Sequence, residues 1–184
     1  MHGKTWVAIL LLASSAGWVV AQTPQGKPDA APMMGGMSME HTKPSGPGGP
    51  LKVSFGDKSA EWTPATLAAL PHTTVTVFNE HAKANQTYSG VALIDLLARL
   101  GVPDKPHGKE FQLYLVAEGV DGYRVVYSIG EVSPDVHDGT VIVADTEDGK
   151  PIADDGPVKL VATGEKRPAR WVRNLVAIRV LTAQ

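Results

Sequence analysis

The chain has 184 residues and no cysteine, and its 17 Lys and Arg residues against 19 Asp and Glu residues give a net charge of −2 at pH 7. The missing cysteine excludes disulfides, thiolate metal sites and a lipid-modified amino-terminal cysteine. A net charge near zero gives no electrostatic reason to expect nucleic acid or an anionic membrane as a partner.

The first 21 residues have the pattern of a signal peptide. Lys4 precedes an apolar run over residues 6–12, and Val19 and Ala21 place small residues at a cleavage site. The apolar stretch is short and interrupted by Ser and Gly, which disfavours a membrane span, although an uncleaved anchor is the alternative. We therefore expect an exported protein, periplasmic or secreted, that has no membrane association once residues 1–21 are removed.

Residues 22–50 have the composition of a disordered linker. They are rich in Pro, Gly, Ser and Lys and contain almost no large apolar residues other than methionine, so they cannot bury enough surface to offset the entropy of ordering. This composition is typical of a low-complexity tether. A copper site is the alternative, because thioether and imidazole groups suit Cu(I). The candidate copper ligands are Met33, Met34, Met37, Met39 and His41.

From residue 51 the pattern predicts one α+β domain that extends to residue 184. Thr63 and Pro64 mark the start of a short helix that ends near residue 70. A second helix is predicted over residues 92–100, because its leucines recur on one face, and Gly101 ends it. Alternating or continuous apolar runs predict strands at 51–55, 73–78, 111–118, 122–128, 140–146, 158–164 and 174–182.

The strand at 73–78 is followed by three polar residues, Asn79, Glu80 and His81. Side chains at a strand end can enter a binding or catalytic site, where His81 could coordinate a metal and Glu80 could act as a base. The same residues also suit a solvated loop. The local pattern favours neither interpretation alone.

Charge is segregated near the carboxyl terminus. Residues 131–155 contain many acids and a single lysine, Lys150, whereas the segment from Lys166 to Arg179 is basic. Such segments usually form two solvated edges that face each other. The basic side chains Lys166, Arg167 and Arg170 could instead bind an anion, because arginine makes bidentate contacts with phosphate.

Three stretches taken in order resemble a known family. They are YSGVALIDLLARLGV (88–102), EGVDGYRVVYSIGEV (118–132) and VADTEDGKPIADDGPVKLVATGEKRPARWVRNLVAIRVL (143–181). Together they resemble the oxidoreductase molybdopterin-binding domain, which has the sulfite-oxidase-like fold. The order and spacing agree across nearly all of residues 60–181. The resemblance implies a single mixed-sheet domain with few short helices.

The resemblance also implies positions for a cofactor site. Catalytic members of the family ligate molybdenum through a cysteine at the end of the strand that here finishes at Phe78 and Asn79, and this chain has no cysteine. Transfer of the family pattern makes Asn79, His81, Asp121, Tyr123, Lys166, Arg167 and Arg170 the candidate cofactor-binding residues. A structural interpretation also covers the first part of EGVDGYRVVYS, because Asp121 and Gly122 suit a tight turn from which Tyr123, Val125 and Tyr127 alternate on one strand face.

These observations predict a binding or accessory module that lacks molybdenum chemistry, since a fold does not carry its chemistry when the decisive ligand is missing. Its expected partner is a small anionic ligand or a periplasmic protein. One alternative is a molybdopterin-dependent oxidoreductase with a non-cysteine metal site. The other is a copper-handling protein that uses the methionine-rich linker.

Overall fold

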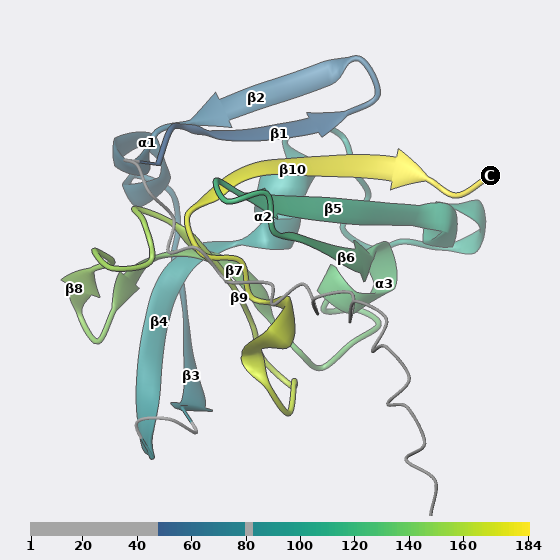
Figure 1. Ribbon diagram of the computed structural model, residues 1–184. Coiled ribbons are helices and arrows are strands. Elements are labelled where there is room, and N and C mark those ends of the chain that lie inside the picture. Colours follow the sequence, from purple (N-terminus) through teal and green to yellow (C-terminus); the bar gives the residue numbers. More distant parts are fainter. Residues whose placement is uncertain (1–47, 80–82) are drawn as a thin grey trace, which may run out of the picture. The chain divides into compact units, whose positions relative to one another are not determined.

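The computed structural model describes residues 48–79 and 83–184, which form two β-sheets with short helices (Figure 1). The first sheet contains β1 (Leu51–Phe55), β2 (Lys58–Trp62), β5 (Leu113–Gly119), β6 (Arg124–Ser128) and β10 (Leu175–Thr182). Its order is β2-β1-β10-β5-β6. Only the β1–β10 pair is parallel within it. The first and last strands of the domain are therefore neighbours.

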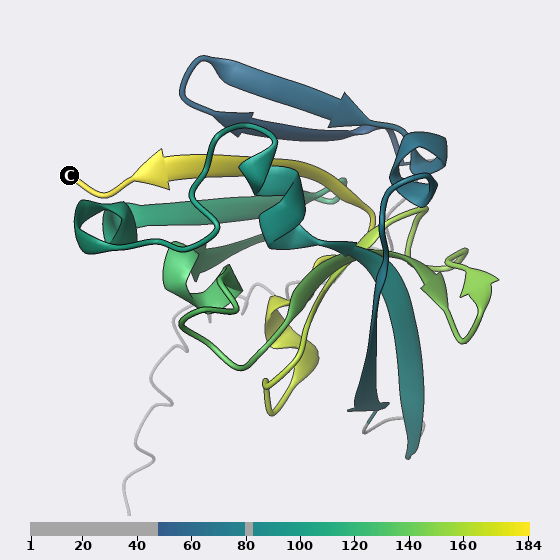
Figure 2. The same cartoon turned by 180° about the vertical axis from the view of Figure 1, so that it is seen from behind.

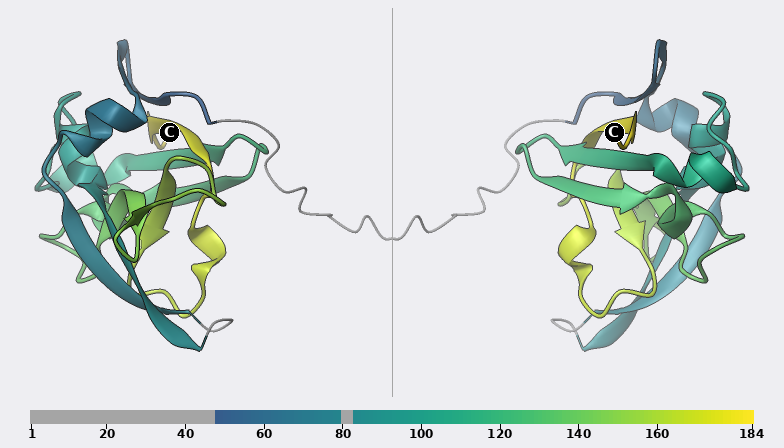
Figure 3. Two further views of the ribbon diagram at one scale, coloured as in Figure 1. Left: turned by 90° about the vertical axis from the view of Figure 1, so that its left-hand side faces the viewer. Right: turned by 90° about the vertical axis from the view of Figure 1, so that its right-hand side faces the viewer.

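The second sheet contains β3 (Thr73–Asn79), β4 (Ala84–Ala92), β7 (Val141–Glu147), β8 (Lys150–Pro151) and β9 (Lys159–Ala162). It follows the path β3-β4-β7-β8, with β9 paired to the other end of β7. All its described pairs are antiparallel. The β3–β4 hairpin and the segment that carries η2 (Pro168–Arg170) extend toward the same end of the domain (Figure 3).

The helices are short. They are α1 (Pro64–Ala68), α2 (Leu93–Ala98), α3 (Ile129–Val132) and the 3-10 turn η1 (Gly108–Gln112). The Thr63 side chain accepts a hydrogen bond from the Thr66 N–H and caps α1, as the sequence predicts. In α3, Ser128 and Glu131 form a reciprocal capping box. No helix in the described ranges is long and apolar enough to span a membrane.

The main core lies between the two sheets, and α2 closes one side of it. Leu93, Leu96 and Leu97 of α2 are almost fully buried there. Because the inner faces of both sheets and the helix share one cluster, the described ranges form one domain, and the α+β class predicted for it is confirmed. A smaller core on the other face of the second sheet is formed by Val75, Tyr88, Ile142, Ala144, Ile152 and Val161, with Val77 and Trp171 packed against it.

Gly90 explains one element of the sequence pattern YSGV. The pairing of β4 with β7 shifts register between Ser89 and Gly90. A Cβ atom at Gly90 would overlap the carbonyl oxygen of Val143 and the Cα of Ala144. The two backbones therefore approach each other so closely at this bulge that only glycine fits.

Candidate functional site

Arg170 is the centre of a charged cluster between η2, α3 and β6. Its Nη1 lies 2.7 Å from Glu131 Oε1 and its Nη2 lies 2.6 Å from Glu165 Oε1. The guanidinium carbon lies 4.5 Å from the ring centroid of Tyr127, an arrangement that favours a cation–π contact. The Arg170 charge is thus compensated within the chain by two carboxylates.

The capping box of α3 positions Glu131 for this contact. Glu131 Oε2 accepts hydrogen bonds from the N–H and hydroxyl groups of Ser128 while Oε1 accepts from Arg170. Burial opposes ionisation of Glu131, but the hydrogen bonds from Ser128 and Arg170 outweigh it and lower the pKa of the carboxyl group. The carboxylate is therefore held ionised opposite the arginine.

Two tyrosine hydroxyls form hydrogen bonds with the backbone of η2. The Tyr127 hydroxyl donates to the Arg170 carbonyl at 2.7 Å, and the Tyr123 hydroxyl donates to the Ala169 carbonyl. Burial raises the pKa of the Tyr127 hydroxyl, which keeps it protonated as a donor. Two regions predicted from sequence, the Asp121–Tyr123 turn and the basic segment, are thus brought together.

The Asp121–Tyr123 region is a turn, as its residues suggest. Asp121 Oδ1 accepts from the Tyr123 N–H at 3.0 Å, and Gly122 has a φ of 79°, which suits glycine. The predicted strand face needs one correction. β6 starts at Arg124, so Val125 and Tyr127 are buried on its inner face while Tyr123 precedes the strand and is exposed.

Lys166 and Arg167 lie in the loop between β9 and η2. Both side chains are exposed, and neither makes an ion pair within the part of the chain that the structure describes. The three predicted basic residues therefore do not act alike. Arg170 turns toward the acids, whereas Lys166 and Arg167 remain directed at solvent.

The cavity beside this loop is small. Its volume is about 60 Å³, whereas sites for drug-sized ligands occupy roughly 300–1,000 Å³. It is lined by Tyr127, Glu131, His137, Val141, Ala162, Thr163, Gly164, Glu165 and Arg170. The residues here do not fit a molybdopterin cofactor, because the space is too small, Arg170 is already paired, and no thiolate ligand exists in the chain.

Asn79, the last residue of β3, belongs to a polar network that crosses β4 and reaches β7. Its Nδ2 donates to Gln86 Oε1 at 2.6 Å, and Gln86 Nε2 donates to Glu147 Oε1 at 2.8 Å. Tyr88 donates its hydroxyl proton to the same Gln86 oxygen. His81 and Glu80 lie outside the described residues, as do the candidate copper ligands Met33, Met34, Met37, Met39 and His41.

The sequence analysis missed Lys159, a buried lysine on β9. Its Nζ lies 2.6 Å from Asp155 Oδ2 and 3.5 Å from the Tyr88 hydroxyl. It also lies 5.1 Å and 5.3 Å from the ring centroids of Tyr88 and Trp171. The only sequence signal is a lysine inside the apolar run at 158–162 with an aspartate four residues earlier.

Trp171 follows Arg170 directly in sequence, and its ring lies beside Lys159. Its indole Nε1–H donates to the Ala162 carbonyl at 2.8 Å, and its ring meets Tyr88 edge to face at 5.4 Å. Arg173, two residues further, lies 3.2 Å from the second oxygen of Asp155. The segment 169–173 is therefore fixed on both sides by charged and aromatic contacts.

His72 and Asp145 form a third polar contact. His72 Nε2 lies 3.0 Å from Asp145 Oδ2, and Nδ1 lies 2.7 Å from the Leu70 carbonyl oxygen. Both partners are acceptors, so the doubly protonated imidazolium satisfies both contacts. The hydrogen bond with Asp145 raises the pKa of His72 above its ordinary value, against an opposing effect of burial.

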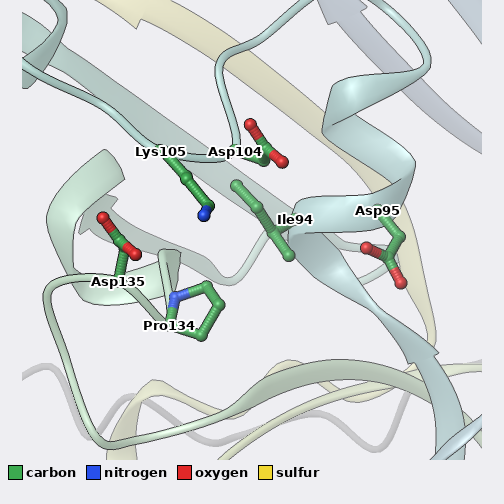
Figure 4. A pocket seen from close by; sticks show the side chains of 6 residues that line it. All are labelled: Ile94, Asp95, Asp104, Lys105, Pro134 and Asp135. Carbon is green, nitrogen blue, oxygen red and sulfur yellow. The ribbon is translucent and has the colours of Figure 1, made fainter.

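A shallow cavity of about 310 Å³ lies away from the predicted site, between α2 and the residues after α3 (Figure 4). Lys105 points into it between Ile94 and Asp135 (Figure 4). Its lining carries three carboxylates and one ammonium group, so its net charge is negative. Within residues 48–79 and 83–184, no group of three or more His, Asp or Glu side chains is arranged to hold a metal ion.

Comparison with known proteins leaves the family open. No protein-family model matches the chain. No curated protein matches it either.

Proposed function

We propose that this protein is an exported binding module of the sulfite-oxidase type that has lost molybdenum chemistry, and that Lys166 and Arg167 recognise a small anionic group. The support for the fold comes from the mixed sheets with few helices and from the ordered motifs at 88–102, 118–132 and 143–181. The absence of any cysteine supports the loss of molybdenum ligation.

The proposal of an anionic ligand rests on one observation, the exposure of two adjacent cations. Lys166 and Arg167 are adjacent, exposed cations whose loop is held in place by the paired Arg170 and by the hydroxyls of Tyr123 and Tyr127. Preorganised charges lose less conformational entropy when a ligand binds. A phosphate or carboxylate would also relieve the repulsion between the two neighbouring cations.

The size of the neighbouring cavity limits the ligand. A volume of about 60 Å³ accepts little more than a water molecule or a small group. The anion must therefore bind on the surface of the loop, with the remainder of its carrier molecule outside the cavity. A compound or protein that presents one phosphate or carboxylate group fits this description better than an enclosed cofactor.

The test is a thermal-shift titration of the purified protein with phosphate, pyrophosphate and a pterin phosphate. Saturable stabilisation is expected, and at a hundredfold excess over the dissociation constant it amounts to about 2.7 kcal/mol. Lys166→Ala/Arg167→Ala should abolish the shift. The matched control is Lys109→Ala, an exposed lysine on η1, which should leave the shift unchanged. Added salt should weaken the response, because exposed charges are screened.

A flat response to all three anions in the wild type would contradict the anion site. Metal content tests the other half of the proposal separately. Stoichiometric molybdenum in protein isolated from its native compartment would contradict the loss of molybdenum chemistry whatever the titration shows.

A further inference from the structure

The outer face of the first sheet is not covered by any part of the described chain. Figure 1 shows α2 behind β10 and β5, and Figure 2, turned by 180°, shows it in front of them. The inner face carries the buried core residues of all five strands. On the outer face, Val126 is 53% exposed and Leu181 is 39% exposed. A bare sheet face with apolar side chains requires an explanation.

Strand register places one row of residues straight across this face. Directly paired residues share a face of a sheet, and here the row runs from the edge strand β2 to the edge strand β6. In order, it consists of Glu61, Lys52, Ala177, Glu118 and Arg124. The charges therefore read negative, positive, neutral, negative, positive.

This row is complementary to its own reverse. A two-fold axis parallel to β10 and lying between two stacked sheets would reverse the strand order and keep the strand direction. Glu61 would then face Arg124 of a second copy, Lys52 would face Glu118, and Ala177 would face Ala177. The alternative axis, perpendicular to the strands, would place every charge opposite the same charge. An isologous dimer needs a self-complementary surface of the first kind.

We infer that a second copy of this chain docks on the outer face of the first sheet, with the sheets stacked about an axis along β10. Ala177 is the small residue of this row on the central strand β10, and Ser54 is a small residue of the next row on the neighbouring strand β1. They allow the sheets to approach the usual separation of about 10 Å. Stacked sheets cross at about 30°, and the long side chains of Glu61 and Arg124 can span the resulting shift at the edges.

Arg179 is the one charged residue of this face that the two-fold axis would place opposite the same residue of the second copy. It lies beside Val116 in the next row, and its Nη1 lies 3.0 Å from Glu118 Oε2. Glu118 also accepts from Arg124 at 2.9 Å, and these contacts lower the pKa of its carboxyl group. The like charges at the axis are therefore compensated within each copy.

The decisive pair is Glu61 with Arg124, because one chain cannot form it. The two residues lie on opposite edge strands, four strand spacings or about 19 Å apart. Arg124→Glu and Glu61→Arg should each place two like-charge contacts in the dimer and raise its dissociation constant by at least about tenfold. The double variant Glu61→Arg/Arg124→Glu restores opposite charges and should return the constant to the wild-type value.

The measurement is sedimentation equilibrium of the full protein at concentrations up to about 1 mM, so that a dimer with a dissociation constant as weak as about 1 mM is still detected. Circular dichroism is the folding control. An equimolar mixture of the two single variants should dimerise like the wild type, since each supplies the charge that the other needs. A monomeric wild type would overturn the inference. So would unchanged association of Arg124→Glu, or a double variant as weak as Arg124→Glu, because the effect would then come from the lost internal contact with Glu118.

Discussion

The buried pair of Lys159 and Asp155 should respond unequally to removal of its two members. Lys159 is 6% exposed and its ammonium group has one carboxylate partner, at 2.6 Å. Asp155 has two cationic partners. It keeps a second cation, Arg173, at 3.2 Å, and 19% of its side chain is exposed. Loss of the lysine therefore leaves a compensated carboxylate, whereas loss of the aspartate leaves a buried cation.

The magnitudes follow from this asymmetry. Asp155→Ala leaves the ammonium group with the Tyr88 hydroxyl and two aromatic faces, and breaking a buried pair in this way costs about 3–5 kcal/mol of unfolding free energy. Lys159→Met keeps the apolar stem between the rings and removes the charge. Its expected cost is about 1–2 kcal/mol, the scale of a hydrogen bond lost without leaving an unpaired buried charge.

The sign of the combined effect is the sharpest test. Adding Lys159→Met to Asp155→Ala removes the uncompensated cation, so the double variant should be more stable than Asp155→Ala alone. Urea unfolding followed by tryptophan fluorescence measures all four proteins, because Trp171 adjoins the pair. An unchanged slope of free energy against urea is the control for comparable unfolding. Equal costs for the two single variants, or a double variant less stable than either, would refute the reasoning.

Three further predictions concern stability. His72 has a folded-state pKa above its ordinary 6.5, so its stabilising contribution is complete below that value and is lost as pH rises through the folded-state pKa. His72→Gln should remove this loss when urea midpoints are compared at about pH 5.5 and about pH 8.5, and an unaltered pH profile would contradict it. Gly90→Ala should lower the free energy of unfolding by about 3 kcal/mol or more, because the added Cβ overlaps the backbone of β7. Gly49→Ala, where the added Cβ meets open space, is the control and should leave the free energy of unfolding unchanged. Arg170→Lys should cost about 1 kcal/mol, because lysine cannot contact both carboxylates and stack on a ring at once, and its melting temperature should fall below that of the exposed-site control Lys166→Arg.

Strands that bury alternate residues were predictable from sequence, and so were the two helices with clear signals. The predicted strand at 51–55 is β1, and the Thr63 cap and the apolar face of α2 are present. β2 and β4 were missed for a physical reason. KSAEW buries only Trp62, and ANQTYSGVA is mostly polar, so neither has an apolar repeat. Their backbones become strands because neighbouring strands pair with them, and that information is not local.

The candidate site was less predictable. Composition identified the basic segment, and the Asp121–Tyr123 turn was predicted and lies against it. The partners of Arg170 could not be assigned from sequence. Glu131 is 39 positions away from Arg170, and any of several acids in residues 131–155 was an equally good partner for the arginine. The capping box of Ser128 and Glu131 is visible in the sequence but does not reveal the second contact of Glu131. Lys159 was missed because a single lysine in an apolar run is also typical of an edge strand.

The parallel pairing of β1 with β10 determines when this domain can fold. β10 lies between β1 and β5, so until the last strand is available the first sheet consists of two separate hairpins with uncovered apolar faces. The chain between the paired strands must close as one long loop, and contacts of such large sequence separation slow folding. The first sheet can therefore form as one unit only after β10 is available to join its two hairpins.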